Sequence, residues 1–166
     1  MRPALSLLAL TLALAGCGGA SSPKATTAAV PPSPAAAVGA GAKTLYQGSA
    51  GWAVVQQGSH AVALHLVDGA WRPDRSGAVR VRVLGPLHSA ARQPQVAAEI
   101  SAKSDLAETA LWVDGQELLV KGGGTARTGT IYGTTSAPLD PGTHVAVAYG
   151  RTAIAATAVA WTFRVP

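Results

Sequence analysis

The only cysteine of this 166-residue sequence, Cys17, is the residue with the most recognisable chemistry. It ends the run LAGC at positions 14–17, after an apolar stretch at 4–15 that follows the basic residue Arg2. A positive start, a short apolar segment and small residues before a cleavage point are typical of a secretory signal peptide. The apolar stretch is too short to span a bilayer as a helix. Small residues let a protease approach the backbone, and the thiol that follows them is a nucleophile.

The run at 14–17 resembles the lipobox of bacterial lipoproteins, in which a Leu and two small residues precede a Cys. The resemblance implies that the Cys17 thiol receives a diacylglyceryl group and that cleavage follows between Gly16 and Cys17, which makes 1–16 a lipoprotein signal peptide. Two or three acyl chains on Cys17 would anchor the protein stably in a membrane, because each buried methylene contributes about 0.8 kcal/mol. Two alternatives remain open: Cys17 is an ordinary small residue of the apolar segment, or a general secretory site nearby is cleaved.

Residues 17–42 are predicted to form a disordered tether that carries the lipidated Cys17. At 18–42, 22 of the 25 residues are Gly, Ala, Ser, Thr or Pro. Such a segment cannot bury enough apolar surface to offset the entropy that it would lose on ordering.

The charge of the sequence is mildly basic. Loss of residues 1–16 removes Arg2 and lowers the net charge from +5 to +4. This charge favours anionic lipid headgroups or wall polymers as partners. No basic motif with interleaved aromatic residues is visible, so we do not expect a nucleic-acid partner.

From residue 43 onward, short alternating runs between turn residues predict an all-β fold. Residues 43–77 are expected to form a β-hairpin segment, joined at 58–59 and closed by the Asp-Gly pair at 68–69. This segment is either an extra pair of strands on the following domain or a small separate sheet. Residues 78–166 continue with further strands, whereas the stretch GGGTARTG at 122–129 is expected to be a flexible loop.

Four segments of the C-terminal half share a pattern: QPQVAAEIS, ALWVDGQELL, APLDPGTHVAVAYG and VAWTFRV. They are similar to bacterial immunoglobulin-like modules of exported proteins, which commonly show a Val-Asp-Gly hairpin, a pLxPGtHtVtV segment and a closing xWxFxV strand. The matching positions are Val113, Asp114, Gly115, Leu139, Pro141, Gly142, His144, Val145, Val147, Trp161, Phe163 and Val165. The resemblance covers about residues 78–166.

This resemblance implies an immunoglobulin-like antiparallel β-sandwich at 78–166, preceded by the hairpin segment and the tether. One departure is the stretch GRTAIAATA at 150–158, where such modules usually carry an Asp-x-Ala-Gly-Asn-like turn. The register of the final hairpin is therefore left open. The matched motifs mark turns and core positions, so they say little about activity.

Candidate catalytic groups are scattered along the sequence. Ser59 precedes His60 and His88 precedes Ser89, but adjacent residues of a strand point to opposite faces. No G-x-S-x-G elbow is present, and the aspartates mostly stand in turn contexts where Asp caps the backbone. We therefore predict no catalytic residue and no enzyme, with an envelope hydrolase as the second alternative function.

The histidines offer the better chemical alternative, an exported sandwich protein that binds copper or zinc. His60 and His65 lie five apart in one expected strand and so face opposite sides, while His88 and His144 are distant in the sequence. The periplasmic copper-resistance family uses an N-terminal His, but the mature N-terminus here would be acylated Cys17. We predict no metal site and no cofactor, and we expect most of the histidines to be solvent-exposed.

Arg80 and Arg82 are candidate binding residues, because they share one face of the expected strand GAVRVRVLGP. Two cations on one face of a sheet can meet an anionic polymer or lipid phosphate. The alternative is a solvated face that keeps the sheet soluble.

Trp112 is the third candidate binding residue. If its neighbours Leu111 and Val113 point inward, Trp112 points outward, and an exposed Trp on a sheet often contacts a partner or a sugar. The alternative is that Trp112 packs under Tyr46, Trp52 or the tether.

The sequence thus predicts a lipid-anchored module of the bacterial cell envelope with a non-catalytic binding or structural role. The anchor at Cys17 would hold it on the extracytoplasmic side of a cell membrane or outer membrane. Its expected partners are that membrane and an anionic wall polymer, lipid headgroups or another envelope protein.

Overall fold

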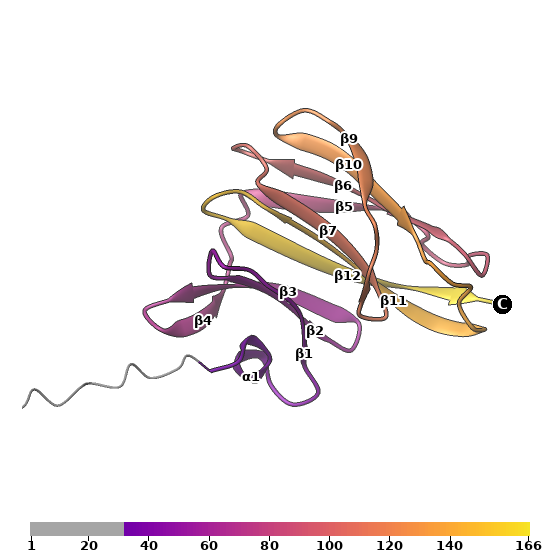
Figure 1. Cartoon of the computed structure of the whole chain (residues 1–166), viewed down its shortest axis with the longest axis horizontal. Coiled ribbons are helices and arrows are strands. Elements are labelled where there is room, and N and C mark those ends of the chain that lie inside the picture. Colours follow the sequence, from indigo (N-terminus) through magenta and orange to yellow (C-terminus); the bar gives the residue numbers. More distant parts are fainter. Residues whose placement is uncertain (1–31) are drawn as a thin grey trace, which may run out of the picture.

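The structure is a computed structural model that describes residues 32–166. The predicted signal peptide, Cys17 and most of the predicted tether lie outside the described residues. Within 32–166, the strands form three antiparallel sheets stacked as layers, and a short helix covers the outside of one of them (Figure 1).

The N-terminal sheet has the order β1-β2-β3-β4. Its strands are β1 (Lys43–Gln47), β2 (Trp52–Gln57), β3 (His60–Val67) and β4 (Ala70–Pro73). Asp68 and Gly69 join β3 to β4 with φ angles of 50° and 76°, and two left-handed residues suit a tight hairpin turn. The predicted hairpin, β2 and β3, is confirmed, and two further strands make it a separate four-stranded sheet.

The outer sheet has the order β5-β6-β10-β9. Its strands are β5 (Val79–Gly85), β6 (Gln95–Ala102), β10 (Thr128–Thr134) and β9 (Lys121–Gly124). Strand β9 lies in the stretch that the sequence predicted to be a loop. Pairing with β10 orders it, and a Cβ at Gly122 would lie 2.7 Å from the carbonyl oxygen of Thr130, so the close approach of the two backbones needs glycine there.

The middle sheet has the order β12-β11-β7-β8. Its strands are β12 (Ala156–Val165), β11 (Gly142–Arg151), β7 (Glu108–Val113) and β8 (Gln116–Glu117). Asp114 and Gly115 form the turn that connects β7 to β8, with φ angles of 51° and 84°. The final hairpin pairs without interruption from Gly142 opposite Val165 to Arg151 opposite Ala156, which settles the register that the sequence left open.

The outer and middle sheets together have immunoglobulin topology. Their strand orders correspond to the A-B-E-D and G-F-C sheets of that fold, with β8 as a short additional strand beside β7. Apolar residues from both sheets form the core between them: Val96, Ala98, Ile100, Leu111, Val113, Ala146, Phe163 and Val165. The predicted immunoglobulin-like sandwich is confirmed by this strand order.

The N-terminal sheet covers the second face of the middle sheet. Trp52 and Val54 of β2 pack there against Trp112, Val147 and Tyr149. Strands β7 and β11 are therefore largely buried on both faces, whereas Thr162 and Arg164 of β12 stay exposed. Figure 1 shows the middle sheet between the other two layers.

Helix α1 (Pro34–Val38) covers the far face of the N-terminal sheet, and it lies within the segment that the sequence predicted to be tether. Ala35 and Val38 pack against the apolar cluster around Trp71, whose indole nitrogen donates a hydrogen bond to the carbonyl oxygen of Pro32 at 2.8 Å. This apolar surface, which only the folded sheet provides, orders the last part of the predicted tether. No helix within residues 32–166 has the length and apolar character needed to cross a bilayer.

The packing of the N-terminal sheet on the middle sheet predicts that Trp112→Ala is strongly destabilising. Trp112 is 1% exposed, and removing a large buried side chain costs about 3–5 kcal/mol. Urea denaturation measures the loss. Leu119→Ala is the control, because Leu119 is 85% exposed and its truncation should cost less than about 0.5 kcal/mol. Equal, small losses for both variants would contradict the packing.

Candidate functional site

Arg80 and Arg82 lie on the solvent face of the outer sheet, as the alternation of β5 predicts. Val79 of the same strand points into the core between the two sheets and is 2% exposed. Arg82 donates two hydrogen bonds to the Glu99 carboxylate, at 3.2 Å and 2.9 Å, from the neighbouring strand β6. These hydrogen bonds lower the pKa of Glu99 and raise the pKa of Arg82. The charge of Arg82 is thus already paired with an acidic side chain.

Arg80 differs from Arg82, since it forms no ion pair within residues 32–166. It stands opposite Ser101 in the β5–β6 ladder. With Ser101, Lys103 and the residues just before β5 it lines a shallow hollow of about 310 Å³. Two cations and a hydroxyl therefore meet on this part of the outer sheet.

Trp112 is not available to a partner, so its prediction as an exposed binding residue is wrong. Its side chain does point away from Leu111 and Val113, but that face of the middle sheet is covered by the N-terminal sheet. The alternative raised from the sequence, packing near Tyr46 and Trp52, is what the structure has. Cys17 lies outside the described residues.

The buried side chain of His144 forms an ionic contact with Asp114, and sequence reasoning missed it by expecting most histidines to be exposed. The imidazole Nδ1 lies 2.6 Å from the Asp114 carboxylate, and Nε2 lies 2.8 Å from the carbonyl oxygen of Asp140. The same carboxylate accepts a 2.9 Å hydrogen bond from the backbone N–H of Val145. In immunoglobulin domains a tyrosine near the start of this strand bonds back to the upstream backbone, and here a histidine does so.

Both groups that face the His144 ring are acceptors, so the geometry requires a donor on each nitrogen, which only the protonated imidazolium has. The hydrogen bond to Asp114 raises the pKa of His144 against the opposing effect of burial. The signal for this contact was present in the sequence, because Asp114 and His144 both belong to the motifs shared with immunoglobulin-like modules.

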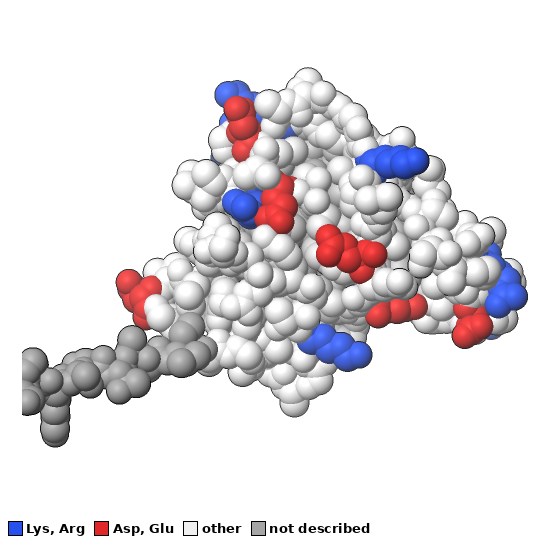
Figure 2. Space-filling model, viewed as in Figure 1, with Lys and Arg blue, Asp and Glu red and all other residues white. Residues whose placement is uncertain are grey.

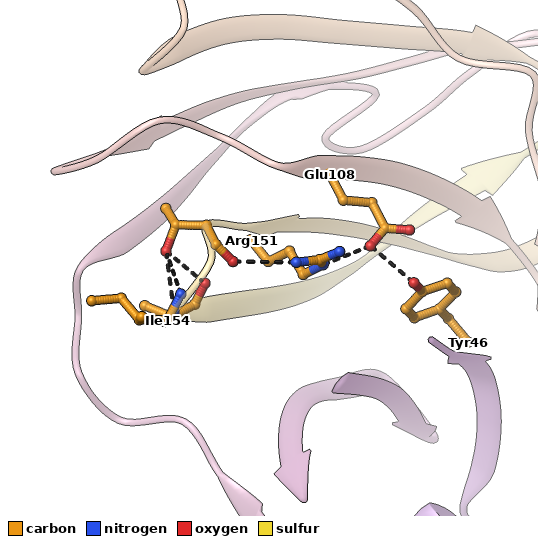
Figure 3. Close-up of polar contacts among 6 residues, drawn as sticks. Tyr46, Glu108, Arg151 and Ile154 are labelled. Carbon is orange, nitrogen blue, oxygen red and sulfur yellow. Dashed lines mark hydrogen bonds and ion pairs between the residues drawn. The ribbon is translucent and has the colours of Figure 1, made fainter. Parts of the chain in front are cut away.

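A second polar cluster joins the N-terminal sheet to the other end of the middle sheet (Figure 3). Glu108 accepts hydrogen bonds from the Arg151 Nε at 2.7 Å and from the Tyr46 hydroxyl at 2.9 Å. These bonds tie β1 to β7 and β11. The nearby hydroxyl of Tyr149 is fully buried with no hydrogen-bond partner among residues 32–166, and burial raises its pKa.

The β11–β12 turn continues this cluster. Thr152, 1% exposed, accepts hydrogen bonds on its hydroxyl from the backbone N–H groups of Ile154 and Ala155, at 3.3 Å and 3.1 Å (Figure 3). The carbonyl oxygen of Thr152 in turn lies 3.4 Å from the Arg151 guanidinium. The turn is thereby fixed, yet it presents Ile154 with 81% of its surface exposed.

Beside this turn lies a groove between the N-terminal sheet and the sandwich, here named the junction groove, with a volume of about 250 Å³. Its lining residues are Trp52, His65, Val67, Arg72, Pro73, Asp74 and Ile154. The ring of His65 stacks on that of Trp52 with centroids 4.1 Å apart and planes 6° from parallel. The sequence offered one signal for this groove, an isoleucine in a hairpin turn, where polar residues are usual.

The remaining charged and candidate chemical groups are mostly dispersed or paired. In residues 32–166, no three His, Cys, Asp or Glu side chains gather where they could hold a metal ion. Ion pairs between exposed side chains include Arg127–Asp105 and Arg92–Asp140. Figure 2 shows some basic and acidic side chains side by side on the viewed face and others standing alone, with broad uncharged areas between them.

No protein-family model matches the sequence, and no curated protein matches it. Among solved structures, titin M4 is similar at 18% identity and a TM-score of 0.36, covering 54% of this chain and 96% of that one. A titin M10–obscurin-like 1 Ig complex is similar at 16% identity and a TM-score of 0.35, covering 53% of this chain and 95% of that one.

A complex of Dpr2 Ig1-Ig2 with DIP-Theta Ig1-Ig3 is also similar, at 12% identity and a TM-score of 0.41, covering 69% of this chain and 40% of that one. Similarities at these scores carry no argument about function. The chain contains an immunoglobulin-like β-sandwich because its own strand order is that of the fold.

The His144 contact predicts a pH-dependent stability. Because the folded-state pKa of His144 is raised above its ordinary value of 6.5, its stabilising effect is complete below that pH and is lost as the pH rises through the raised pKa. We expect His144→Gln to cost about 1–2 kcal/mol at pH 6 and clearly less at about pH 9.

Urea denaturation of both proteins across this pH range measures the difference. His88→Gln is the matched control, since His88 is exposed in a loop and its replacement should cost little at any pH. A cost of His144→Gln that stays constant with pH would contradict the charged imidazolium.

Proposed function

We propose that this chain is a lipid-anchored, non-catalytic binding or structural module of the bacterial cell envelope, held on the extracytoplasmic side of its membrane through Cys17. The anchor is supported by the sequence at 1–17, where a basic start, an apolar run and the LAGC motif stand in the order of a lipoprotein signal. At the start of the described residues, the carbonyl oxygen of Pro32 accepts a hydrogen bond from the Trp71 indole.

The open cation Arg80 is the observation that carries the binding role. The outer sheet presents it at a shallow, solvent-exposed hollow beside Lys103 and Ser101, whereas Arg82, Arg127 and Arg151 are held in ion pairs. An unpaired guanidinium next to a second cation suits carboxylate or phosphate groups. Anionic wall polymer, lipid headgroups and an acidic envelope protein all offer such groups.

The anchor predicts that Cys17→Ala leaves the precursor uncleaved or releases the protein from the membrane fraction. The reason is that the thiol is the acceptor of the lipid, and cleavage follows lipidation. Membrane fractionation and labelling with a radioactive fatty acid measure the change, with Ser21→Ala as a control that keeps the LAGC run intact. A Cys17→Ala protein that is processed normally and stays on the membrane would overturn the anchor.

The binding role predicts that Arg80→Glu weakens retention of an unlipidated Cys17→Ser protein on isolated envelopes by about tenfold at low salt, because one attractive contact becomes repulsive. Sedimentation measures the bound fraction. Arg164→Glu is the control, since Arg164 is an exposed arginine on β12 of another sheet. Unchanged retention of Arg80→Glu would show that this surface does not bind.

A further inference from the structure

The junction groove combines exposed apolar surface with a fixed backbone. Of the large apolar side chains exposed in residues 32–166, Val67 at 37% and Ile154 at 81% both line it. Ile154 is held at the tip of a turn whose hydrogen bonds to Thr152 leave it little freedom. A turn whose backbone is already ordered loses little backbone entropy on binding, which favours the use of its apolar residue as a contact.

The charge of the groove is set by Arg72 and Asp74, and the two are not equivalent. The Asp74 carboxylate accepts hydrogen bonds from the backbone N–H of Ala156 at 2.6 Å and from the backbone and hydroxyl of Ser76 at 2.8 Å and 3.2 Å. The Asp74 carboxylate is therefore already used to join the segment after β4 to the first residue of β12. Arg72 is exposed and forms no ion pair within residues 32–166, so the groove offers an open cation.

His65 fixes the wall of the groove next to Arg72. The two residues are direct partners in the β3–β4 ladder, and the imidazole is held flat against the Trp52 indole. Trp52 itself is 2% exposed, so it supports the wall of the groove, and the surface open to a partner consists of Arg72, Val67 and Ile154. Arginine is enriched among the residues that contribute most to protein–protein binding. A volume of about 250 Å³ is small for a pocket that encloses a whole small molecule, and it suits one side chain of a partner.

We propose that the junction groove docks a segment of a partner protein in which a carboxylate stands beside an apolar side chain. The carboxylate meets the Arg72 guanidinium, and the apolar side chain packs between Val67 and Ile154. This surface belongs to the N-terminal sheet and the β11–β12 turn, apart from Arg80 on the outer sheet. It depends neither on the Cys17 anchor nor on envelope retention, so its failure would leave the proposed function standing.

The test uses the soluble Cys17→Ser chain from residue 17 to 166 and two probes that differ only in charge, N-acetyl-phenylalanine and its uncharged amide. NMR titration follows the methyl signals of Val67 and Ile154 and the indole signal of Trp52. We expect these signals to shift with the acid at millimolar concentration and the amide to bind about tenfold more weakly, because only the acid forms a charge-assisted contact.

Variants at exposed positions locate the contacts. Arg72→Gln should abolish the preference for the acid, and Ile154→Ser should weaken both probes several-fold. Arg164→Gln and Leu119→Ser are the matched controls, equally exposed and elsewhere on the surface, and should bind as the parent does.

Three results would overturn the proposal: equal binding of acid and amide, a preference that survives Arg72→Gln, or no shift of the groove signals with either probe. Vesicles of anionic phosphatidylglycerol form a separate arm. If they shift the groove signals while the acid probe does not, the groove faces a lipid surface and the assignment to a protein segment is wrong.

Discussion

Strands β7 and β11 of the middle sheet are covered on both faces, and the rest of the molecule is arranged around this constraint. An antiparallel sheet commonly has one buried and one solvated face, which gives a simple apolar and polar alternation. Here β7 and β11 carry apolar or small residues on both sides, so that Leu111 enters the sandwich core and Trp112 enters the second core. Space is limited as well, because a Cβ at Gly150 would lie 2.5 Å from a methyl carbon of Ile100.

Burial on both faces moves the polar groups to the ends of the middle strands. Asp114 and His144 stand at one end of the β7–β11 pair, while Glu108 and Arg151 stand at the other. Each pair also forms a hydrogen bond outside β7 and β11. His144 contacts the backbone carbonyl of Asp140, and Glu108 accepts a hydrogen bond from Tyr46 of the N-terminal sheet. These contacts close the ends of the layers, and the second one fixes how the N-terminal sheet sits on the sandwich.

The functional proposals rest on the arginines that form no ion pair and on the apolar side chains that stay exposed in this arrangement of three sheets. Of the eight arginines in residues 32–166, four form ion pairs that join strands or loops, and four do not: Arg72, Arg75, Arg80 and Arg164. Among the unpaired ones, Arg80 lies on the outer sheet and Arg72 in the junction groove. The groove exists because a third sheet is added to an immunoglobulin-like sandwich and its edge meets the β11–β12 turn. A tethered protein of this kind would present two separate contact surfaces, one polar and one mixed.

Local patterns in the sequence determined most of the strands and the Asp-Gly turns at 68–69 and 114–115, because alternation and turn chemistry depend on neighbouring residues. The immunoglobulin-like sandwich was predicted from the resemblance of four segments to bacterial immunoglobulin-like modules. The LAGC motif is local too, and Cys17 remains a prediction from sequence. Tertiary structure alone decided the burial of Trp112, the ordering of α1 and the strand β9, since each needs a surface or a partner strand supplied by another segment. The contacts of His144 and Ile154 likewise join segments far apart in the chain, and alternation along one strand carries no information about which sheet covers its second face.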